Sequence, residues 1–380
     1  MKITQVKLHL LSAPLSEPIG NALMFFASRD TLLVEIIADG VSGWGEAWVA
    51  PVVAAKLIET SLAACVIGQD PSHIGRLWQT LRDAAGGEPG MTAVAAMDMA
   101  LHDLTARLYD VPLSTLLGGA VREQVLAYAS GPFFKPGGHP YRNFEPEIDG
   151  YLASGFRAFK MRSGFSPVDD AAAAIAARRQ IGEDAALMVD FNQSVTPRNA
   201  IATALRMEEA DLLWIEEPAS PQDVAGYSLV SEQVRSALAG GETYRSAAAF
   251  LPFLQRGSLD VLQPDIAICG GLTGVLRVVA LAELFDRPVI PHIWGSTVNF
   301  HAALHLLSTL ATHRAGPTSA FPYLEYDVGP NPLLDLAGHP ALNADGTVSV
   351  PTGPGLGIAL DAKVIERWRV AHITIGPSQG

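Results

Sequence analysis

The 380-residue chain has few of the features that mark several large protein classes. Its only cysteines are Cys65 and Cys269, so neither a disulfide framework nor a cysteine-rich zinc site is expected. It has no run of basic residues, and its net charge is −13 at pH 7. A nucleic-acid partner is not expected, because phosphate binding needs clustered Lys and Arg.

Long apolar runs are also missing. No apolar stretch reaches membrane-spanning length, so no membrane partner is expected. The first residues, MKITQVKLHLL, lack the long apolar run and small-residue cleavage site of a signal peptide. The expected location is therefore the cytoplasm.

The composition that remains is typical of a folded protein. Hydrophobic residues make up 49% of the chain and charged residues 17%, which argues against disorder. A chain of this length can form one large barrel or two domains.

The first part of the chain predicts strands followed by helices. Residues 2–11 and 30–40 have the pattern of two antiparallel strands, with a loop between them over residues 16–29. Residues 91–119 then place apolar side chains at helical spacing and end in two glycines.

From about residue 125 the pattern changes to short apolar strands separated by stretches of helix length. The strands expected are residues 125–130, 158–162, 186–192, 212–218, 237–242, 261–265, 288–295 and 320–326. Eight strands alternating with helices predict a parallel (β/α) barrel. The Gly- and Pro-rich stretch after residue 330 is expected to return over the first domain.

Polar side chains recur where these strands end. They are Lys160, Arg162, Asp190, Asn192, Glu216, Glu242, Asp265, His292 and Glu325. Successive strand ends are separated by about one βα unit, so we expect these groups to surround one mouth of the barrel, where barrel enzymes have their active sites.

Three of these groups are carboxylates on successive strands: Asp190, Glu216 and Glu242. Together they would repel one another unless neutralised. Mg²⁺ is the predicted partner, because it binds a few carboxylates and leaves positions for water or substrate oxygens. Glu217 is expected to point away from this group and to pair structurally, because strand side chains alternate.

His292 follows the strand after Asp265. An aspartate that accepts the Nδ1–H of a histidine fixes its tautomer and makes the other ring nitrogen more basic. The pair therefore predicts a general base or acid. His301 and His305 are four residues apart on the next predicted helix, but we expect surface or packing roles there because no third metal ligand is evident.

These motifs carry a family resemblance over nearly the whole chain. The sequence resembles the mandelate racemase/muconate lactonizing enzyme group of the enolase superfamily through AAMDMALHDLTARLYDVPLSTLLGG, FKMR, MVDFN, WIEEP, GGET, LQPD, GG and PHIWG, in family order. The resemblance implies a modified (β/α)7β barrel over residues 123–330 under an N-terminal α+β capping domain over residues 1–122. Residues 331–380 would complete the capping domain.

The resemblance also implies a chemistry. The expected step is removal of the proton α to a carboxylate, with Mg²⁺ on Asp190, Glu216 and Glu242 stabilising the charge that develops. Lys160 suits an electrostatic role in that step, and a protonated Glu325 could donate a hydrogen bond. The substrate would be a small carboxylate, and family members commonly form homo-oligomers.

Specificity residues are implied on the loops of the capping domain, near Leu23–Phe26 and in the 40s to 50s of the sequence. Phe25 and Phe26 are the substrate-binding candidates there, and Asn192 and Trp294 are the candidates on the barrel. For Trp294, a packing role is nearly as well supported.

One position departs from the family pattern. The mandelate racemase subgroup usually has Lys-x-Lys on this strand, whereas here the second position is Arg162. A guanidinium is a poor base but a good carboxylate clamp. We therefore expect a single base, the Asp265–His292 pair, and a sugar-acid dehydratase. The alternatives are a lactone cycloisomerase, a racemase or epimerase, and a non-catalytic binding protein on the same fold.

Overall fold

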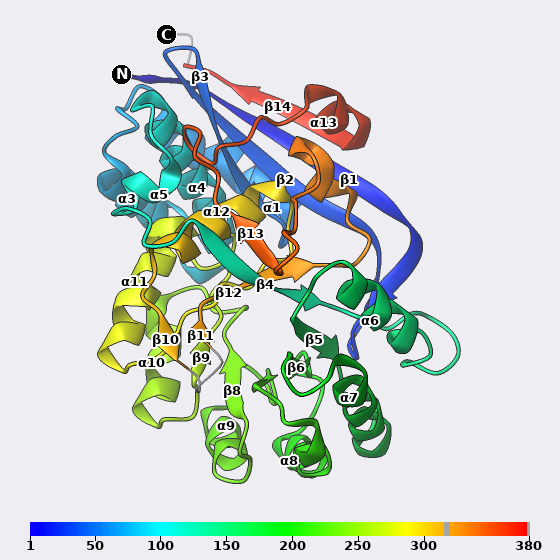
Figure 1. Cartoon of the computed structure of the whole chain (residues 1–380). Coiled ribbons are helices and arrows are strands. Elements are labelled where there is room, and N and C mark those ends of the chain that lie inside the picture. The colour runs from blue at the N-terminus through cyan, green and yellow to red at the C-terminus, as the bar shows by residue number, and fades with distance from the viewer. Residues whose placement is uncertain (315–319, 378–380) are drawn as a thin grey trace.

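Two sheets of different kinds organise the chain, which a computed structural model describes over residues 1–314 and 320–377 (Figure 1). One is an antiparallel sheet in the order β14-β1-β2-β3, and the other is a parallel barrel sheet in the order β12-β4-β5-β6-β7-β8-β9. The predicted fold class, a (β/α) barrel with an N-terminal α+β domain, is confirmed. Within the described residues, no helix has both the length and the apolar character needed to cross a membrane.

The antiparallel sheet and the helices packed on it form the capping domain. Its strands are β1 (Ile3–Gly20), β2 (Phe25–Ala38), β3 (Val41–Ala47) and β14 (Arg369–Ile375). Its helices are α1 (Pro51–Leu57), which continues into a π-helical turn (Ile58–Leu62), then α2 (Ala63–Val66), α3 (Ile74–Ala84), a 3₁₀ turn (Glu88–Gly90), α4 (Met91–Leu108) and α5 (Leu113–Leu116).

Helix α4 is buried on nearly all sides. Its residues from Met91 to Ala106 are all buried, although Asp98, His102 and Asp103 are polar. The carboxylates are hydrogen-bonded, because Asp98 accepts from Thr273 and Asp103 from the backbone of Trp44. It packs directly on β3, where a Cβ added at Gly45 would lie 1.9 Å from the carbonyl oxygen of Ala96. This close approach requires glycine at position 45 and holds the capping sheet directly against α4.

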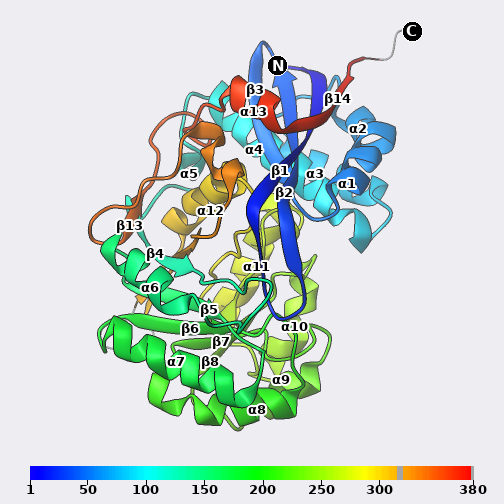
Figure 2. The same cartoon turned by 90° about the vertical axis from the view of Figure 1, so that its right-hand side faces the viewer.

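The β1–β2 hairpin extends from the capping sheet down to the barrel (Figure 2). Its tip is bonded there, because Gly20 and Phe134 exchange two backbone hydrogen bonds of 2.8 and 2.9 Å. Phe134 lies in the segment after β4, so the loop of the capping domain covers the ends of the first barrel strands.

Seven of the eight predicted barrel strands form ladders. They are β4 (Gln124–Ser130), β5 (Ala158–Arg162), β6 (Ala186–Asp190), β7 (Trp214–Glu216), β8 (Ala237–Gly240), β9 (Val261–Leu262) and β12 (Tyr323–Asp327). The helices are α6 (Phe144–Ala153), α7 (Pro167–Ile181), α8 (Pro197–Arg206), the 3₁₀ turn Glu208–Ala210, α9 (Val224–Ser231), α10 (Ala247–Gln255), α11 (Gly271–Leu284) and α12 (Thr297–Thr309).

The predicted strand over residues 288–295 is reduced to two isolated bridges, Leu262 with Val289 and Asp265 with His292. Pro291 lies between the bridges and has no N–H to donate to a ladder. His292 is nevertheless placed beside Asp265, as a continuous strand would place it.

The C-terminal segment contacts both domains. β13 (Thr347–Ser349) pairs with β4 of the barrel, whereas β14 pairs with β1 of the capping sheet. A 3₁₀ helix (Pro332–Ala337) precedes β13, and α13 (Ala362–Trp368) lies between β13 and β14. The short strands β10 (His313–Arg314) and β11 (Ala320–Phe321), earlier in the chain, pair with each other.

Candidate active site

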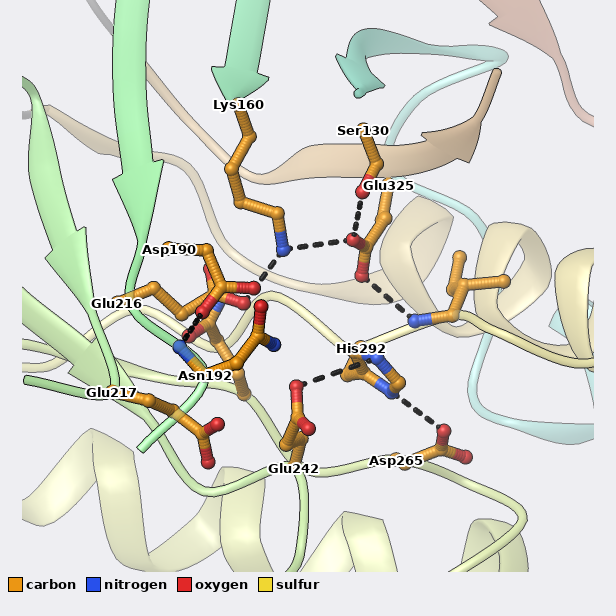
Figure 3. A network of polar contacts seen from close by, with 12 residues as sticks. Ser130, Lys160, Asp190, Asn192, Glu216, Glu217, Glu242, Asp265, His292 and Glu325 are labelled. Carbon is orange, nitrogen blue, oxygen red and sulfur yellow. Dashed lines mark hydrogen bonds and ion pairs between the residues drawn. The ribbon is translucent and has the colours of Figure 1, made fainter. Parts of the chain in front are cut away.

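The polar strand ends predicted from the sequence converge inside the barrel (Figure 3). Asp190 is the last residue of β6 and lies opposite Glu216, the last residue of β7. Lys160 on β5 is fully buried. Successive side chains of a strand alternate in direction, so these three residues share the interior while Met161 and Val189 pack in the core outside it.

The three carboxylates Asp190, Glu216 and Glu242 have the arrangement of a metal site. Each offers one oxygen, and these oxygens all lie within 4.8 Å of one another. Asp190 and Glu216 are buried, while Glu242 is partly exposed. This all-oxygen donor set fits a hard divalent cation such as Mg²⁺ and leaves one side open.

Burial is the main influence on this triad. It raises the pKa of the carboxyl groups of Asp190, Glu216 and Glu242, although Lys160 acts in the opposite direction on all three. A bound cation would favour their ionised forms, because an opposite charge stabilises a carboxylate.

Both cations of β5 are paired with the triad. The Nζ of Lys160 lies 2.6 Å from Oε1 of Glu216 and 2.8 Å from Oε1 of Glu325. Arg162 forms an ion pair with Asp190 and donates to Oγ of Ser130 at 3.3 Å. Burial favours the neutral form of Lys160, but Glu216 and Glu325 outweigh it and raise the pKa of the ammonium. Lys160 and Arg162 are therefore held in their charged forms and are poorly suited to accept a proton.

Glu325 is an acceptor in this network. It accepts the hydroxyl of Ser130 at 2.7 Å and the backbone N–H of Ile293 at 2.9 Å, in addition to Lys160. Burial favours its neutral form, but Lys160, His292 and Arg162 outweigh it and lower the pKa of Glu325 to about 2. The protonated Glu325 considered from the sequence does not fit this arrangement, because donors already face both carboxylate oxygens.

The predicted histidine–aspartate pair is formed. Nδ1 of His292 lies 2.8 Å from Oδ2 of Asp265, and Nε2 lies 3.4 Å from Oε2 of Glu242. Burial lowers the pKa of His292, but Glu242, Glu325 and Asp265 together raise it to about 10. Nδ1 is hydrogen-bonded to Asp265, so Nε2 is the nitrogen that faces Glu242 of the triad.

Four of the polar residues at the strand ends, Arg162, Asn192, Glu242 and His292, border a cavity of about 60 Å³ below the capping domain. The residues that line it are Gly20, Asn21, Phe26, Trp48, Phe133, Arg162, Asn192, Glu242, His292 and Trp294. A larger hollow of about 640 Å³ lies around the opposite strand ends, near Leu187 and Leu213. The smaller cavity is the better candidate, because the charged groups converge on it.

Aromatic rings form one wall of this cavity. The ring centroid of Trp294 is 5.1 Å from that of Phe26 and 5.7 Å from that of Phe133. Arg29 stacks on Trp294 at 3.7 Å and forms a 2.9 Å ion pair with Asp327. On the polar side, Oδ1 of Asn192 is buried and has no hydrogen-bond partner among the described residues, so it is available to a ligand.

Phe25 and Phe26, the two substrate-binding candidates on the capping domain, point in different directions. Phe26 lines the cavity, whereas Phe25 is not among the lining residues and leaves 51% of its surface exposed. Adjacent strand residues face opposite sides, and β2 begins at Phe25, so only one of the two can face the barrel. Phe25 is therefore not placed as the sequence interpretation expected.

The remaining sequence candidates lie outside the cavity. Glu217 points away from Lys160 and Glu325 (Figure 3) and accepts from the amide of Gln193 at 2.8 Å. His301 and His305 are buried in α12, where Nδ1 of His301 bonds to the carbonyl oxygen of Thr297 at 2.7 Å. These contacts support packing roles.

Sequence reasoning missed Trp48, Ser130 and Gln263. Trp48 lies in the 40s to 50s region named for the capping domain, but nothing in its motif marks it as a partner of Asp265. Gln263, two residues before Asp265, donates to Oε2 of Glu216 at 2.6 Å. Its place within LQPD was the available signal, because it shares the strand face of Asp265.

Comparisons with known proteins show the family of the chain. Residues 4–118 match the family described as "Mandelate racemase / muconate lactonizing enzyme, N-terminal domain", and residues 144–364 match "Enolase C-terminal domain-like". The chain is 34% identical over 376 residues to the D-galactarolactone cycloisomerase of Agrobacterium fabrum, covering 97% of this chain and 99% of that protein.

Two further relatives extend the comparison. The D-galactonate dehydratase of Ralstonia nicotianae is 32% identical over 358 residues, which covers 88% of this chain and 89% of the relative. The crystal structure of a racemase from Streptomyces coelicolor with bound magnesium superposes with a TM-score of 0.86 at 29% identity, covering 97% of this chain and 100% of that one. The resemblance seen in the sequence is thus confirmed.

Proposed function

This chain belongs to the mandelate racemase/muconate lactonizing enzyme family of the enolase superfamily, and we propose that it catalyses a one-base β-elimination on a sugar acid. Dehydration is the proposed overall reaction. The observation that carries the proposal is the position of His292, which lines the cavity and has its Nδ1 held by Asp265. The two cations of β5 are not suited to be the base, because the ammonium of Lys160 is buried between Glu216 and Glu325 and the guanidinium of Arg162 is a poor base.

Asp190, Glu216 and Glu242 are the residues that would bind Mg²⁺. Such an ion would supply positive charge that stabilises the ionised substrate carboxylate and neutralises Glu242, the main group that raises the pKa of His292.

The side chains of the site have different roles in the proposed elimination. Lys160 and Arg162 stabilise the negative charge that develops on the substrate carboxylate. Nε2 of His292 accepts the α-proton, and the C–H electron pair forms the enediolate. The β-hydroxyl then leaves as water with the proton from His292, and the resulting enol becomes a 2-keto-3-deoxy acid. Oδ1 of Asn192 accepts a hydrogen bond from a substrate hydroxyl.

Opening of a lactone is the second candidate. It uses the same base and the same elimination, but the leaving group is the ring oxygen. The aromatic wall of Phe26, Phe133 and Trp294 favours it, because three rings offer few partners for the hydroxyls of an open-chain acid. A racemase is less well supported, because among the described residues that line the cavity, only His292 is free of a metal-ligand role and suited to accept a proton.

A substrate screen tests the proposal. Aldonic and aldaric acids and their lactones are incubated with the protein and Mg²⁺, with keto-acid formation and lactone loss followed separately. We expect keto acid from at least one acid, loss of activity with EDTA and recovery with Mg²⁺. Turnover that persists unchanged in EDTA would contradict the proposal. A homo-oligomeric assembly and a cytoplasmic location stay predictions.

A further inference from the structure

Asp265 receives a hydrogen bond from the capping domain as well as from its histidine. The Nε1–H of Trp48 donates to Oδ2 of Asp265 at 3.0 Å, although 217 residues separate the two in the sequence. The same oxygen lies 2.8 Å from Nδ1 of His292. Trp48 comes one residue after the end of β3, so the contact joins the two domains at the candidate base.

The Asp265 carboxylate is fully buried and has four hydrogen-bond partners, of which Trp48 is one. Its other oxygen accepts the backbone N–H of Ala267 at 2.7 Å and the amide of Asn299 at 3.3 Å. A carboxylate oxygen has two lone pairs, so Trp48 and His292 together occupy Oδ2. The four donors fix the plane of the carboxylate and, through it, the plane of the imidazole.

The strand that carries Trp48 is anchored to the same part of the barrel. Glu46, two residues earlier and fully buried, accepts the N–H and the hydroxyl of Ser296 at 2.7 Å each. It also accepts the backbone N–H of Asn299 at 3.0 Å. Ser296 and Asn299 lie at the start of α12, so Glu46 fixes the helix that supplies Asn299 to Asp265. The same strand end of the capping domain supplies the indole of Trp48 to Asp265.

The indole also faces the cavity. Its ring centroid lies 5.8 Å from that of His292 and 6.5 Å from that of Trp294, and Trp48 is among the lining residues. Its N–H and its ring therefore serve different neighbours: the N–H reaches Asp265, while the ring borders the space for a substrate.

We propose that Trp48 is a positioning residue, which completes the Asp265–His292 pair from the capping domain and makes the direction of Nε2 depend on how that domain packs on the barrel. Its catalytic consequence rests on the proposed function, whereas the hydrogen bond itself does not.

Removing the N–H while keeping a ring tests the kinetic consequence. Trp48→Phe is compared with Trp294→Phe, which also shortens a cavity-lining aromatic but whose indole N–H has no hydrogen-bond partner among the described residues. For Trp48→Phe we expect kcat to fall about 10- to 100-fold, as for partners that orient a ligand or base, with KM within about threefold. Trp294→Phe is expected to change mainly KM. A kcat within about twofold of wild type for Trp48→Phe overturns the proposal.

A second replacement guards against a ring-packing effect. Benzothienylalanine at position 48 keeps a bicyclic ring and replaces only the N–H by sulfur. It is expected to reproduce the kcat loss. If it restores wild-type kcat while Trp48→Phe does not, ring packing is responsible and the proposal fails.

A measurement without substrate separates this proposal from the proposed function. The ¹H–¹⁵N indole resonance that disappears in Trp48→Phe is followed in the whole protein. We expect it to be protected from solvent exchange and to lose that protection in Asp265→Asn, where the acceptor is weakened. An indole that exchanges freely in the wild type overturns the positioning role, even if sugar acids are turned over. A protected indole without any turnover leaves the hydrogen bond standing and counts against the function alone.

Discussion

Two sets of side chains in the interior of the barrel differ sharply in polarity although they come from the same segments of the chain. The apolar set is Tyr128, Ala158, Met188, Trp214, Val261, Ile290 and Tyr323. The polar set is Ser130, Lys160, Asp190, Glu216, Gln263, His292 and Glu325. Each polar residue follows its apolar counterpart by two positions, so both lie on the interior face.

The comparison shows how buried charge is tolerated at one end of the barrel. The apolar set closes the interior below the site, and two of its members also contact the charges above. The Nε1–H of Trp214 donates to Glu216 at 3.1 Å, and the ring of Tyr128 lies 5.4 Å from the ammonium of Lys160. Isolated buried charges are costly, so the polar set depends on pairing within itself and on these oriented contacts.

The largest effect is expected from removing the base in the polar set. His292→Asn keeps a side chain of similar polarity but cannot take the α-proton at neutral pH. We expect kcat to fall by about 10³-fold or more, with far-UV circular dichroism and Mg²⁺ affinity close to wild type. Activity near wild type in a folded, metal-binding variant would show that the base lies elsewhere.

The next effect comes from the apolar set. Trp214 is fully buried, and Trp214→Ala is expected to reduce the free energy of unfolding by about 3–5 kcal/mol, because it creates a cavity. Trp214→Phe serves as the control, since it keeps a ring and loses mainly the bond to Glu216. Urea unfolding measures both. Equal losses for the two variants would mean that packing below the charged set contributes little.

Two buried histidines have pKa values shifted in opposite directions, which makes the effect of their surroundings measurable through the pH dependence of stability. His292, among carboxylates, has its pKa raised to about 10, whereas burial lowers the pKa of His305 in α12 to about 4. Because the folded-state pKa of His305 is below its unfolded value of about 6.5, its stabilising contribution is complete above pH 6.5. It is lost as the pH falls towards 4, by an amount on the order of 3 kcal/mol.

His305→Gln tests this pH dependence. Glutamine keeps an acceptor for the backbone N–H of Ser114, which Nδ1 of His305 accepts at 3.3 Å, but it does not titrate. Thermal unfolding between pH 6.5 and 4 should therefore depend less on pH in the variant. Identical slopes for the two proteins would exclude His305 as the source.

The smallest effect on stability is expected from replacing Glu217, the residue that follows Glu216 in the sequence. Glu217 is buried, and burial together with Glu242 and Asp190 raises its pKa well above the usual value. Glu217→Gln is nearly isosteric and keeps a polar side chain beside Gln193, so the free energy of unfolding should change by only about 1 kcal/mol or less. Glu216→Gln should weaken Mg²⁺ binding by about tenfold or more. Titration calorimetry distinguishes the two neighbours, and equal losses of affinity would contradict the assignment of the triad.

The sequence could predict most of the barrel because short apolar strands alternate with stretches of helix length, and much of the site because these strands end in polar residues at regular intervals. Asp190, Glu216 and His292 occupy the interior for the same reason that Met161 does not: side chains alternate along a strand. Arg162 could likewise be recognised as a cation in the place of a second lysine.

Contacts between the domains could not be predicted in this way. The bond from Trp48 to Asp265 depends on how the capping sheet packs on the barrel, which no local pattern records. The choice of Phe26 over Phe25 depends on the register of the β1–β2 hairpin, which is irregular between Pro14 and Ile19. The acceptor role of Glu325 depends on donors from other segments, including the backbone N–H of Ile293.

The central claim is that one base, on one face of the substrate, carries out the chemistry. The direct measurement is turnover of an active sugar acid in deuterated water with Mg²⁺, followed by ¹H NMR of the product and of the unreacted substrate. The account predicts loss of the α-hydrogen on the way to keto acid, with any deuterium in recovered substrate at the α-carbon in its original configuration. Deuterium at the α-carbon of the epimer would require a second base and would contradict the claim.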